Sequence, residues 1–163
     1  MIRDTPLAED LEDINALPQM LADISSDYGI NEIGKAQNIP LETWPYEYTT
    51  GSLIHIEHPE YTALCPRSGY PDFGTIVIDY EPDAKVFELK AIKLYINSFR
   101  DRRISHENVI NEIADKIYTD VLPSTLRIIG DFTRRGGIKT VVTVYRGGEW
   151  IHEYWPPYVN NIL

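Results

Sequence analysis

The spacing of apolar residues in the first forty positions predicts an amphipathic helix. Apolar residues recur there every three or four positions, with acidic residues between them. These residues are Leu7, Leu11, Ile14, Leu17, Leu21 and Ile24. Pro18 should kink or divide the helix, and the stretch 27–46, which contains Gly and Pro, is expected to be a connecting loop. We therefore expect an N-terminal helical extension over residues 1–43 and a single domain over residues 44–163.

Four later segments have the patterns of strands. Residues 52–57 alternate between apolar and polar side chains and are expected to end at Pro59. Residues 75–80 are rich in β-branched side chains. Residues 126–132 and 140–145 are similar and flank an Arg-Arg-Gly-Gly turn.

Two helices separate the two strand pairs. The apolar face of the first is predicted from Leu89, Ile92, Ile96 and Phe99, and Ser105 is a suitable N-cap for the second. The order strand, strand, helix, helix, strand, strand predicts the α+β class, with one antiparallel sheet and both helices on one face. Such a small sheet leaves open edges that must be paired or covered. We therefore expect a homo-oligomer that closes the sheets across subunits.

Composition and charge narrow the range of partners. The 163 residues include 15 Lys and Arg against 25 Asp and Glu, a net charge of −10. This charge repels phosphate backbones and anionic lipid, so we expect no direct nucleic-acid partner and no membrane partner. There is no apolar run of membrane-spanning length and no signal-peptide pattern. The chain has one cysteine, which excludes an internal disulfide and a Cys-rich zinc site. We expect a cytoplasmic protein.

The only thiol, Cys65, has two interpretations. Free cysteines are often buried small hydrophobic residues. However, Cys65 enters a loop rich in Pro and Gly, next to Arg67 and seven residues before Asp72. A nearby cation favours the thiolate, and a positioned carboxyl group could pass protons to whatever the sulfur attacks. Nucleophilic chemistry at Cys65 is therefore a hypothesis from the residues alone.

A row of polar residues follows one face of the first predicted helix. Lys90 and Lys93 lie one turn apart, opposite the apolar face, and Asn97 and Arg100 continue the row. This row is either an ordinary solvated helix face or a local anion site in an acidic protein. Arg135 is a further candidate for binding the phosphates of a nucleotide cofactor. No GxGxxG pattern follows a strand, so a Rossmann domain is not supported.

A histidine and two carboxylates are also candidates. His106 and Glu107 fall in the first turn of the second helix, where Glu107 either complements the helix dipole or accepts hydrogen bonds from a purine-like edge. His106 is either a surface residue or a proton shuttle. Glu88, which precedes the two lysines, is similarly ambiguous.

The remaining histidines do not predict a metal site. His55 and His58 are three positions apart, which in a strand places them on opposite faces, and no third ligand lies nearby in sequence. His152 belongs to an aromatic tail with Trp150 and Trp155, which we assign to packing or an interface.

These motifs together resemble the NADPH-dependent 7-cyano-7-deazaguanine reductases, the nitrile reductases of queuosine biosynthesis. The hallmark of that family stands complete as Glu-Leu-Lys-Ala-Ile-Lys-Leu-Tyr at residues 88–95. The loop Cys-Pro-Arg-Ser-Gly-Tyr-Pro-Asp at 65–72 and the His-Glu pair at 106–107 match the other family motifs in the same order. The resemblance covers about residues 50–138. Each motif occurs once, as in the short, single-copy members of the family.

The resemblance implies a fold and a chemistry. Family members have the tunnelling fold, of strand and helix order ββααββ, and form oligomeric β-barrels with active sites between neighbouring chains. Their cysteine attacks the nitrile carbon to form a covalent thioimide, which NADPH, as co-substrate, reduces to the amine in tRNA modification. No metal is implied.

The resemblance also implies catalytic, substrate-binding and cofactor-binding roles for individual residues. The resemblance makes Cys65 the nucleophile and Asp72 the proton donor, and His106 lines the site and assists proton transfer. Phe87, Glu88, Leu89, His106 and Glu107 are implied to bind the substrate. Lys90, Lys93 and Arg135 are implied to bind the cofactor phosphates. Arg134 stands where the family is expected to have proline.

Three rival functions remain. A related amidinotransferase would use the same cysteine on nitrile-bearing tRNA without NADPH, but the intact motif at 88–95 and the net charge argue against it. A cyclohydrolase of the same fold would need a metal site. A non-catalytic binding or assembly protein would keep the fold, and alkylation of Cys65 would then have no catalytic consequence.

Overall fold

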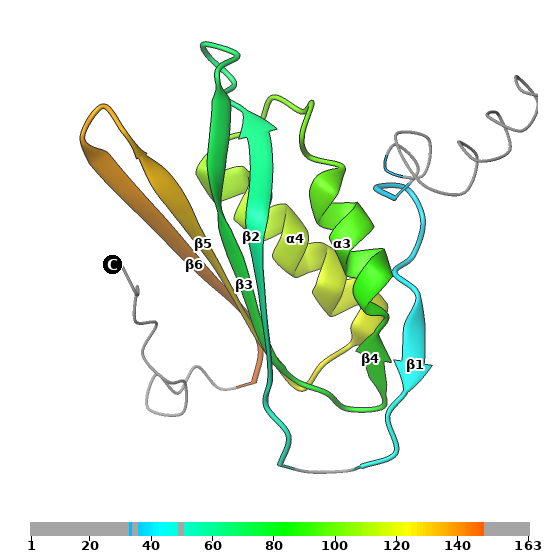
Figure 1. The fold of residues 1–163 in the computed structure, drawn as a ribbon. Coiled ribbons are helices and arrows are strands. Elements are labelled where there is room, and N and C mark those ends of the chain that lie inside the picture. The colour runs from blue at the N-terminus through cyan, green and yellow to red at the C-terminus, as the bar shows by residue number, and fades with distance from the viewer. Residues whose placement is uncertain (1–32, 34–35, 49–50, 149–163) are drawn as a thin grey trace, which may run out of the picture.

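A computed structural model describes residue 33 and residues 36–48 and 51–148 of the chain (Figure 1). The elements follow in the order β1 (Thr43–Pro45), β2 (Ile54–Leu64), β3 (Pro71–Glu81), β4 (Lys85–Phe87), α3 (Leu89–Asn97), α4 (His106–Val121), β5 (Thr125–Arg135) and β6 (Ile138–Gly147). The helix predicted over residues 7–24 and the aromatic tail around His152 lie outside the described residues, so both stay predictions. The described part of the chain contains no helix of the length and apolar character needed to cross a membrane.

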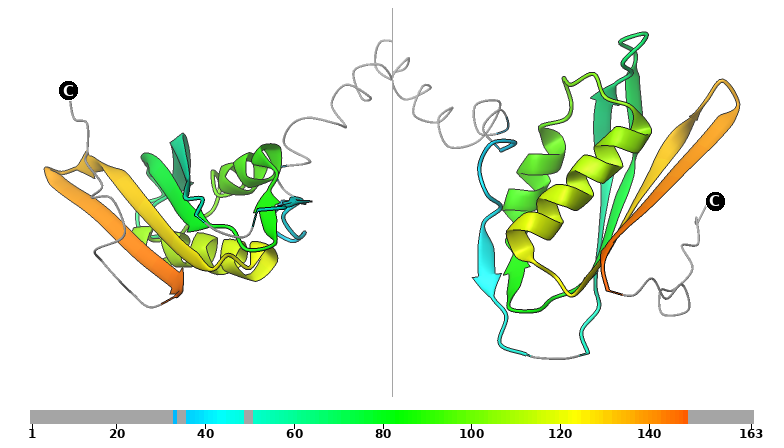
Figure 2. Two further views of the ribbon diagram at one scale, coloured as in Figure 1. Left: turned by 90° about the horizontal axis from the view of Figure 1, so that it is seen from below. Right: turned by 180° about the vertical axis from the view of Figure 1, so that it is seen from behind.

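The main sheet has four antiparallel strands in the order β2-β3-β5-β6. Both helices lie behind this sheet in Figure 1 and in front of it in the reverse view of Figure 2, so they cover one face. α4 packs on β5 and β6, and α3 packs on β2. The predicted α+β class, with an antiparallel sheet and two helices on one face, is confirmed.

The core lies between this face of the sheet and the helices. Alternate β3 residues Ile76, Ile78 and Tyr80 are almost fully buried, as are Ile113 and Ile117 of α4. This is the period-2 pattern of a strand meeting the three- and four-residue spacing of a helix. Tight packing here fixes how α4 lies along the sheet.

Hydroxyl and carboxylate caps set where the two helices begin. The Ser105 Oγ accepts a hydrogen bond from the Asn108 backbone N–H at 3.2 Å, so the predicted N-cap of α4 is confirmed. Glu88 caps α3 in the same way, because its Oε2 accepts from the Ala91 N–H at 2.8 Å. α4 therefore starts with His106 beside the end of β2, and α3 starts at the opposite end of the sheet (Figure 1).

Three local expectations are wrong. β2 does not end at Pro59 but continues to Leu64, because the proline sits where the register with β3 shifts between His58 and Tyr61. A bulge on an edge strand tolerates the missing N–H of proline. The stretch expected to be a loop up to residue 46 contains β1, which pairs with β4 in a separate two-stranded sheet. Leu89 is 62% exposed instead of buried, because it stands at the first position of α3, at the end of the apolar stripe.

Candidate active site

Cys65 lies in a tight loop between β2 and β3, at one end of the sheet. Its backbone N–H donates to the Tyr70 carbonyl at 2.8 Å, and its own carbonyl accepts from the Gly69 N–H at 2.9 Å. Gly69 has a φ of +71°, a left-handed conformation that glycine adopts without strain. The thiol is free and partly exposed. The loop is thus closed by its own backbone and presents the sulfur at its start.

The surroundings of the thiol favour its ionised form. The pKa of Cys65 falls from an ordinary value of 9.0 to about 7, first because of hydrogen bonds from the Ser68 hydroxyl and backbone amide. The Arg67 amide and the Arg135 guanidinium add smaller contributions, and partial desolvation opposes them. About half of the thiols are therefore thiolate near pH 7, which is the reactive form of cysteine.

Asp72 and His106 lie beside this loop. Asp72 is 9% exposed, and its Oδ2 is 3.6 Å from the His106 Nε2. The His106 ring stacks on Phe132 of β5 with 3.8 Å between ring centroids and 6° between planes. Its Nε2 is buried and makes no hydrogen bond within the described residues. The structure thus brings together Cys65, Asp72 and His106, the three residues that the sequence singled out for catalysis.

Arg135 belongs to the same cluster. It ends β5, and its Nη1 donates to Asp72 Oδ1 at 2.7 Å while its Nη2 donates to Ser68 Oγ at 2.8 Å. From the sequence, Arg135 is predicted to bind the cofactor phosphates together with Lys90 and Lys93. The structure places its guanidinium against the loop that carries Cys65, in contact with the predicted proton donor, and its binding of phosphate stays a prediction.

The predicted substrate-binding residues fall into two groups. Glu107 is exposed in the first turn of α4, on the same end of the sheet as Cys65. Phe87, Glu88 and Leu89 lie at the other end, because β3 runs the full length of the sheet between Asp72 and the turn to β4 (Figure 1). A strand of this length spans roughly 35 Å. One chain therefore does not bring these two groups together.

The side chains around Glu88 have local roles of their own. The Phe87 ring is buried and stacks on Tyr80, with 5.0 Å between centroids and 27° between planes. The Glu88 carboxylate caps α3. The Phe87 ring is therefore part of the core, and its backbone pairs with Thr43 of β1.

The cationic row on α3 fits an anionic group. Lys90, Lys93 and Arg100 are exposed, and Asn97 is partly exposed between them. In a chain of net charge −10 such a row is a local positive surface suited to phosphate. A pocket of about 590 Å³ at the C-terminal end of α3 is lined in part by Asn97 and Arg100, but it includes neither Cys65 nor Glu88.

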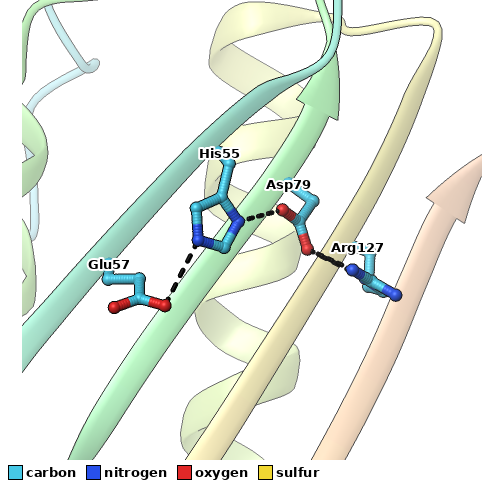
Figure 3. A network of polar contacts seen from close by, with 4 residues as sticks. All are labelled: His55, Glu57, Asp79 and Arg127. Carbon is cyan, nitrogen blue, oxygen red and sulfur yellow. Dashed lines mark hydrogen bonds and ion pairs between the residues drawn. The ribbon is translucent and has the colours of Figure 1, made fainter. Parts of the chain in front are cut away.

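The other two histidines lie away from Cys65. His55 binds Asp79 on the sheet face opposite the helices, where Asp79 also accepts from Arg127 at 2.7 and 2.9 Å (Figure 3). His58 faces Asn97 and Lys93 of α3, so the two histidines point to opposite faces as predicted. Among residues 33, 36–48 and 51–148, no three His, Cys, Asp or Glu side chains are grouped to hold a metal ion.

Sequence reasoning missed two residues of the site. Ser68 is three positions after Cys65 in the catalytic loop, and a hydroxyl so close to a candidate nucleophile was a signal available from the sequence. Phe132 gave no such signal, because its stacking on His106 depends on how α4 crosses β5.

A low-pKa thiol beside a buried carboxylate and a histidine, on an α+β scaffold, defines a protein that is suited to covalent attack by sulfur. Residues 71–149 match the family described as QueF-like protein. The chain is 49% identical over 118 residues to an NADPH-dependent 7-cyano-7-deazaguanine reductase of Sulfurovum sp. (strain NBC37-1), covering 72% of this chain and 94% of that one. It therefore belongs to the QueF-like family.

One further relative and one solved structure are also similar to this chain. A reductase of the same name from Aquifex aeolicus (strain VF5) is 51% identical over 118 residues, covering 72% of this chain and 89% of the relative. The crystal structure titled "archaeosine synthase QueF-Like in the apo form" superimposes with a TM-score of 0.58 at 23% identity, over 62% of this chain and 99% of that one. The likeness to this crystal structure shows a shared fold.

Proposed function

We propose that the chain is an NADPH-dependent oxidoreductase that reduces the nitrile of 7-cyano-7-deazaguanine to 7-aminomethyl-7-deazaguanine, a step in queuosine biosynthesis. The observation that carries this proposal is the Cys65 thiol, which lies in the loop beside Asp72 and His106 and whose pKa hydrogen bonds from Ser68 lower to about 7. About half of the aligned residues are identical to those of relatives named for this reaction.

Covalent attack begins the proposed reaction. The Cys65 thiolate adds to the nitrile carbon, so that an S–C bond forms while one C–N π bond breaks. The nitrogen takes up the proton that the Cys65 thiol releases on ionising, and the Asp72 carboxylate, with His106 beside it, relays that proton. The product is a thioimide, which holds the substrate in place and is a better electrophile than the nitrile.

Reduction completes the reaction. When bound, NADPH supplies hydride, and two hydrides with two protons convert the nitrile into the aminomethyl group. Asp72 and His106 hold the protons that the nitrogen takes up. Cleavage of the C–S bond after the first reduction returns the Cys65 thiolate, so the enzyme emerges unchanged.

The base would be recognised between two copies of the chain. Glu107, which is exposed in the first turn of α4, would accept hydrogen bonds from the base edge, while Phe87, Glu88 and Leu89 would come from a neighbouring subunit. The separation of these groups along one sheet supports this assignment. We propose that subunits join through open sheet edges into the β-barrel of the tunnelling fold.

The lysine row would hold the co-substrate. Lys90 and Lys93 offer positive charge on an exposed helix face, as the phosphates of NADPH require. The overall negative charge argues against a nucleic-acid partner. A free thiol nucleophile suits a reducing compartment, so a cytoplasmic location is part of the proposal.

The test is NADPH oxidation, followed by absorbance, on addition of 7-cyano-7-deazaguanine. We expect two NADPH consumed per nitrile, with the aminomethyl product found by mass spectrometry, and no consumption by Cys65→Ala. An oligomeric, folded wild type that consumes no NADPH would overturn the proposal. Product formation from nitrile-bearing tRNA and ammonia without NADPH would identify the chain as an amidinotransferase instead.

A further inference from the structure

The turn between β5 and β6 reaches the catalytic loop through one side chain. The Arg135 guanidinium is bound at both ends, by Asp72 through Nη1 at 2.7 Å and by Ser68 through Nη2 at 2.8 Å. Its Cζ also lies 5.6 Å from the centre of the Tyr70 ring. One planar group thus contacts Asp72, Ser68 and Tyr70 of the loop, and it also makes a weaker hydrogen bond to the Cys65 sulfur itself.

The shape of the guanidinium makes this contact specific. Its donors form a rigid fork, so binding Asp72 and Ser68 together fixes the distance between them. A lysine has a single ammonium at the end of a flexible stem and could not hold both partners in a set geometry. The arrangement therefore depends on the fork as well as on the charge.

The Ser68 hydroxyl links this fork to the sulfur. Its Oγ accepts hydrogen bonds from Arg135 Nη2 at 2.8 Å and from the Tyr70 backbone N–H at 3.3 Å. A hydroxyl has two acceptor positions and one hydrogen. With both acceptor positions engaged, its hydrogen is left to point at the neighbouring Cys65 sulfur, to which Ser68 is hydrogen-bonded.

We propose that Ser68 and Arg135 are positioning residues for the nucleophile: Arg135 fixes the Ser68 hydroxyl so that it donates to the Cys65 thiolate, and the same guanidinium holds Asp72 beside the reacting sulfur. This assignment rests on the proposed function only in taking Cys65 as the nucleophile. It gives Arg135 a role different from that of a phosphate ligand.

Alkylation of Cys65 by iodoacetamide tests the proposal without substrate or NADPH. The pH at which the rate is half-maximal reports the ionisation of the thiol, whatever the intrinsic reactivity of the thiolate. We expect this midpoint near pH 7 in the wild type. Ser68→Ala should move it upward toward the value of an ordinary thiol and lower the rate at pH 7 by about fivefold to tenfold.

Four further variants separate positioning from charge and from loss of folding. Ser68→Thr keeps the hydroxyl and should restore the wild-type midpoint. Arg135→Ala and Arg135→Lys should both raise the midpoint, because neither keeps the fork. Arg134→Ala is the matched control, since Arg134 is exposed one position earlier in β5, and it should leave the midpoint unchanged.

The alkylation and activity measurements distinguish the positioning role from a phosphate-binding role and from failure of the proposed function. Midpoints that stay near the wild-type value in both Ser68→Ala and Arg135→Ala would overturn the proposal. If Arg135→Ala only raises the KM for NADPH, and Arg135→Lys restores it, Arg135 is a phosphate ligand and the proposal is wrong. A wild type with a low midpoint but no reductase activity would overturn the proposed function and leave the positioning role standing.

Discussion

Two histidines of β2 have opposite electrostatic surroundings, although only three positions separate them. His55 faces carboxylates with both ring nitrogens, Asp79 at 2.6 Å from Nδ1 and Glu57 at 3.2 Å from Nε2 (Figure 3). Both nitrogens can donate only in the protonated ring, so these contacts, Asp79 first, raise the pKa of His55. Burial instead lowers the pKa of His58.

This difference predicts opposite pH dependences of stability. A raised pKa means that His55 stabilises the fold below its unfolded pKa of 6.5, and that this contribution is lost as pH rises through the folded value. His55→Gln should therefore lower the free energy of unfolding by about 0.5 kcal/mol at pH 5.5, since the side chain is half exposed, and by less at pH 8.5. Urea unfolding at both pH values measures this.

The neighbouring histidine is the internal control. Because the pKa of His58 is lowered, its contribution is present above pH 6.5 and is lost as pH falls through the folded value. His58→Gln should therefore cost less at pH 5.5 than at pH 8.5. Equal losses at both pH values for His55→Gln would contradict the account.

Single residues also show how far the sequence predicts the site. Cys65 and Asp72 were predictable, because a thiol and a carboxylate flank one short turn-rich loop. The partners of Arg135 were not, because its contact with Asp72 spans 63 positions and depends on the register of β3, β5 and β6. From its charge alone, Arg135 was predictable as a ligand of an anion, and its binding of a cofactor phosphate stays a prediction.

At the level of elements, a glycine allows α4 to pack closely on β5. A Cβ built on Gly130 would lie 2.4 Å from Ile110 Cδ1 and 2.8 Å from the Phe132 ring. Both neighbours are fully or almost fully buried, so neither has space to move. Gly130 is therefore needed for the close contact of this helix with the strand.

Gly130→Ala should destabilise the protein by about 1–3 kcal/mol through overpacking. Thermal unfolding at fixed protein concentration measures the loss. Gly136→Ala is a useful comparison, because a Cβ there meets no atom within 4 Å and only the left-handed backbone, with φ +56°, is strained. An unchanged unfolding temperature for Gly130→Ala would contradict the packing described here.

The elements that sequence patterns predicted are those with long apolar stretches. The helices repeat apolar residues every three or four positions, and β3 and β5 are runs of β-branched and apolar side chains that are buried almost continuously, so local sequence indicated all four. β1 and β4 have three residues each, which is too few for a sequence pattern. They pair only because the tertiary fold brings these distant segments together. Pro59 was read as a strand end by local rules, whereas the edge position of β2 and its register shift accommodate it.

At the level of the whole molecule, the proposed substrate-binding residues lie at two ends of one sheet. Cys65, Asp72 and Glu107 are at one end, and Glu88 and Leu89 are at the other. A site that uses all of them needs two copies of the chain. This is a property of the proposed assembly that can be tested without its structure.

Mixing two inactive variants tests the shared site. Cys65→Ala and Glu88→Gln should each be nearly inactive alone. Co-expressed in equal amounts, they should regain activity in about one quarter of the sites, because random assembly pairs an intact Cys65 with an intact Glu88 from the neighbour at that frequency. Activity that stays at the level of the separate variants would show that each site belongs to one chain.

Capture of the covalent intermediate tests the central claim, that Cys65 is the nucleophile of nitrile reduction, most directly. Intact mass spectrometry after incubation with 7-cyano-7-deazaguanine, without NADPH, should show wild type heavier by the full mass of the substrate, because the thiol adds across the nitrile and nothing leaves. Peptide mapping should place the adduct on Cys65, and NADPH should discharge it. An adduct that persists in Cys65→Ala would contradict the account, as would NADPH turnover by that variant.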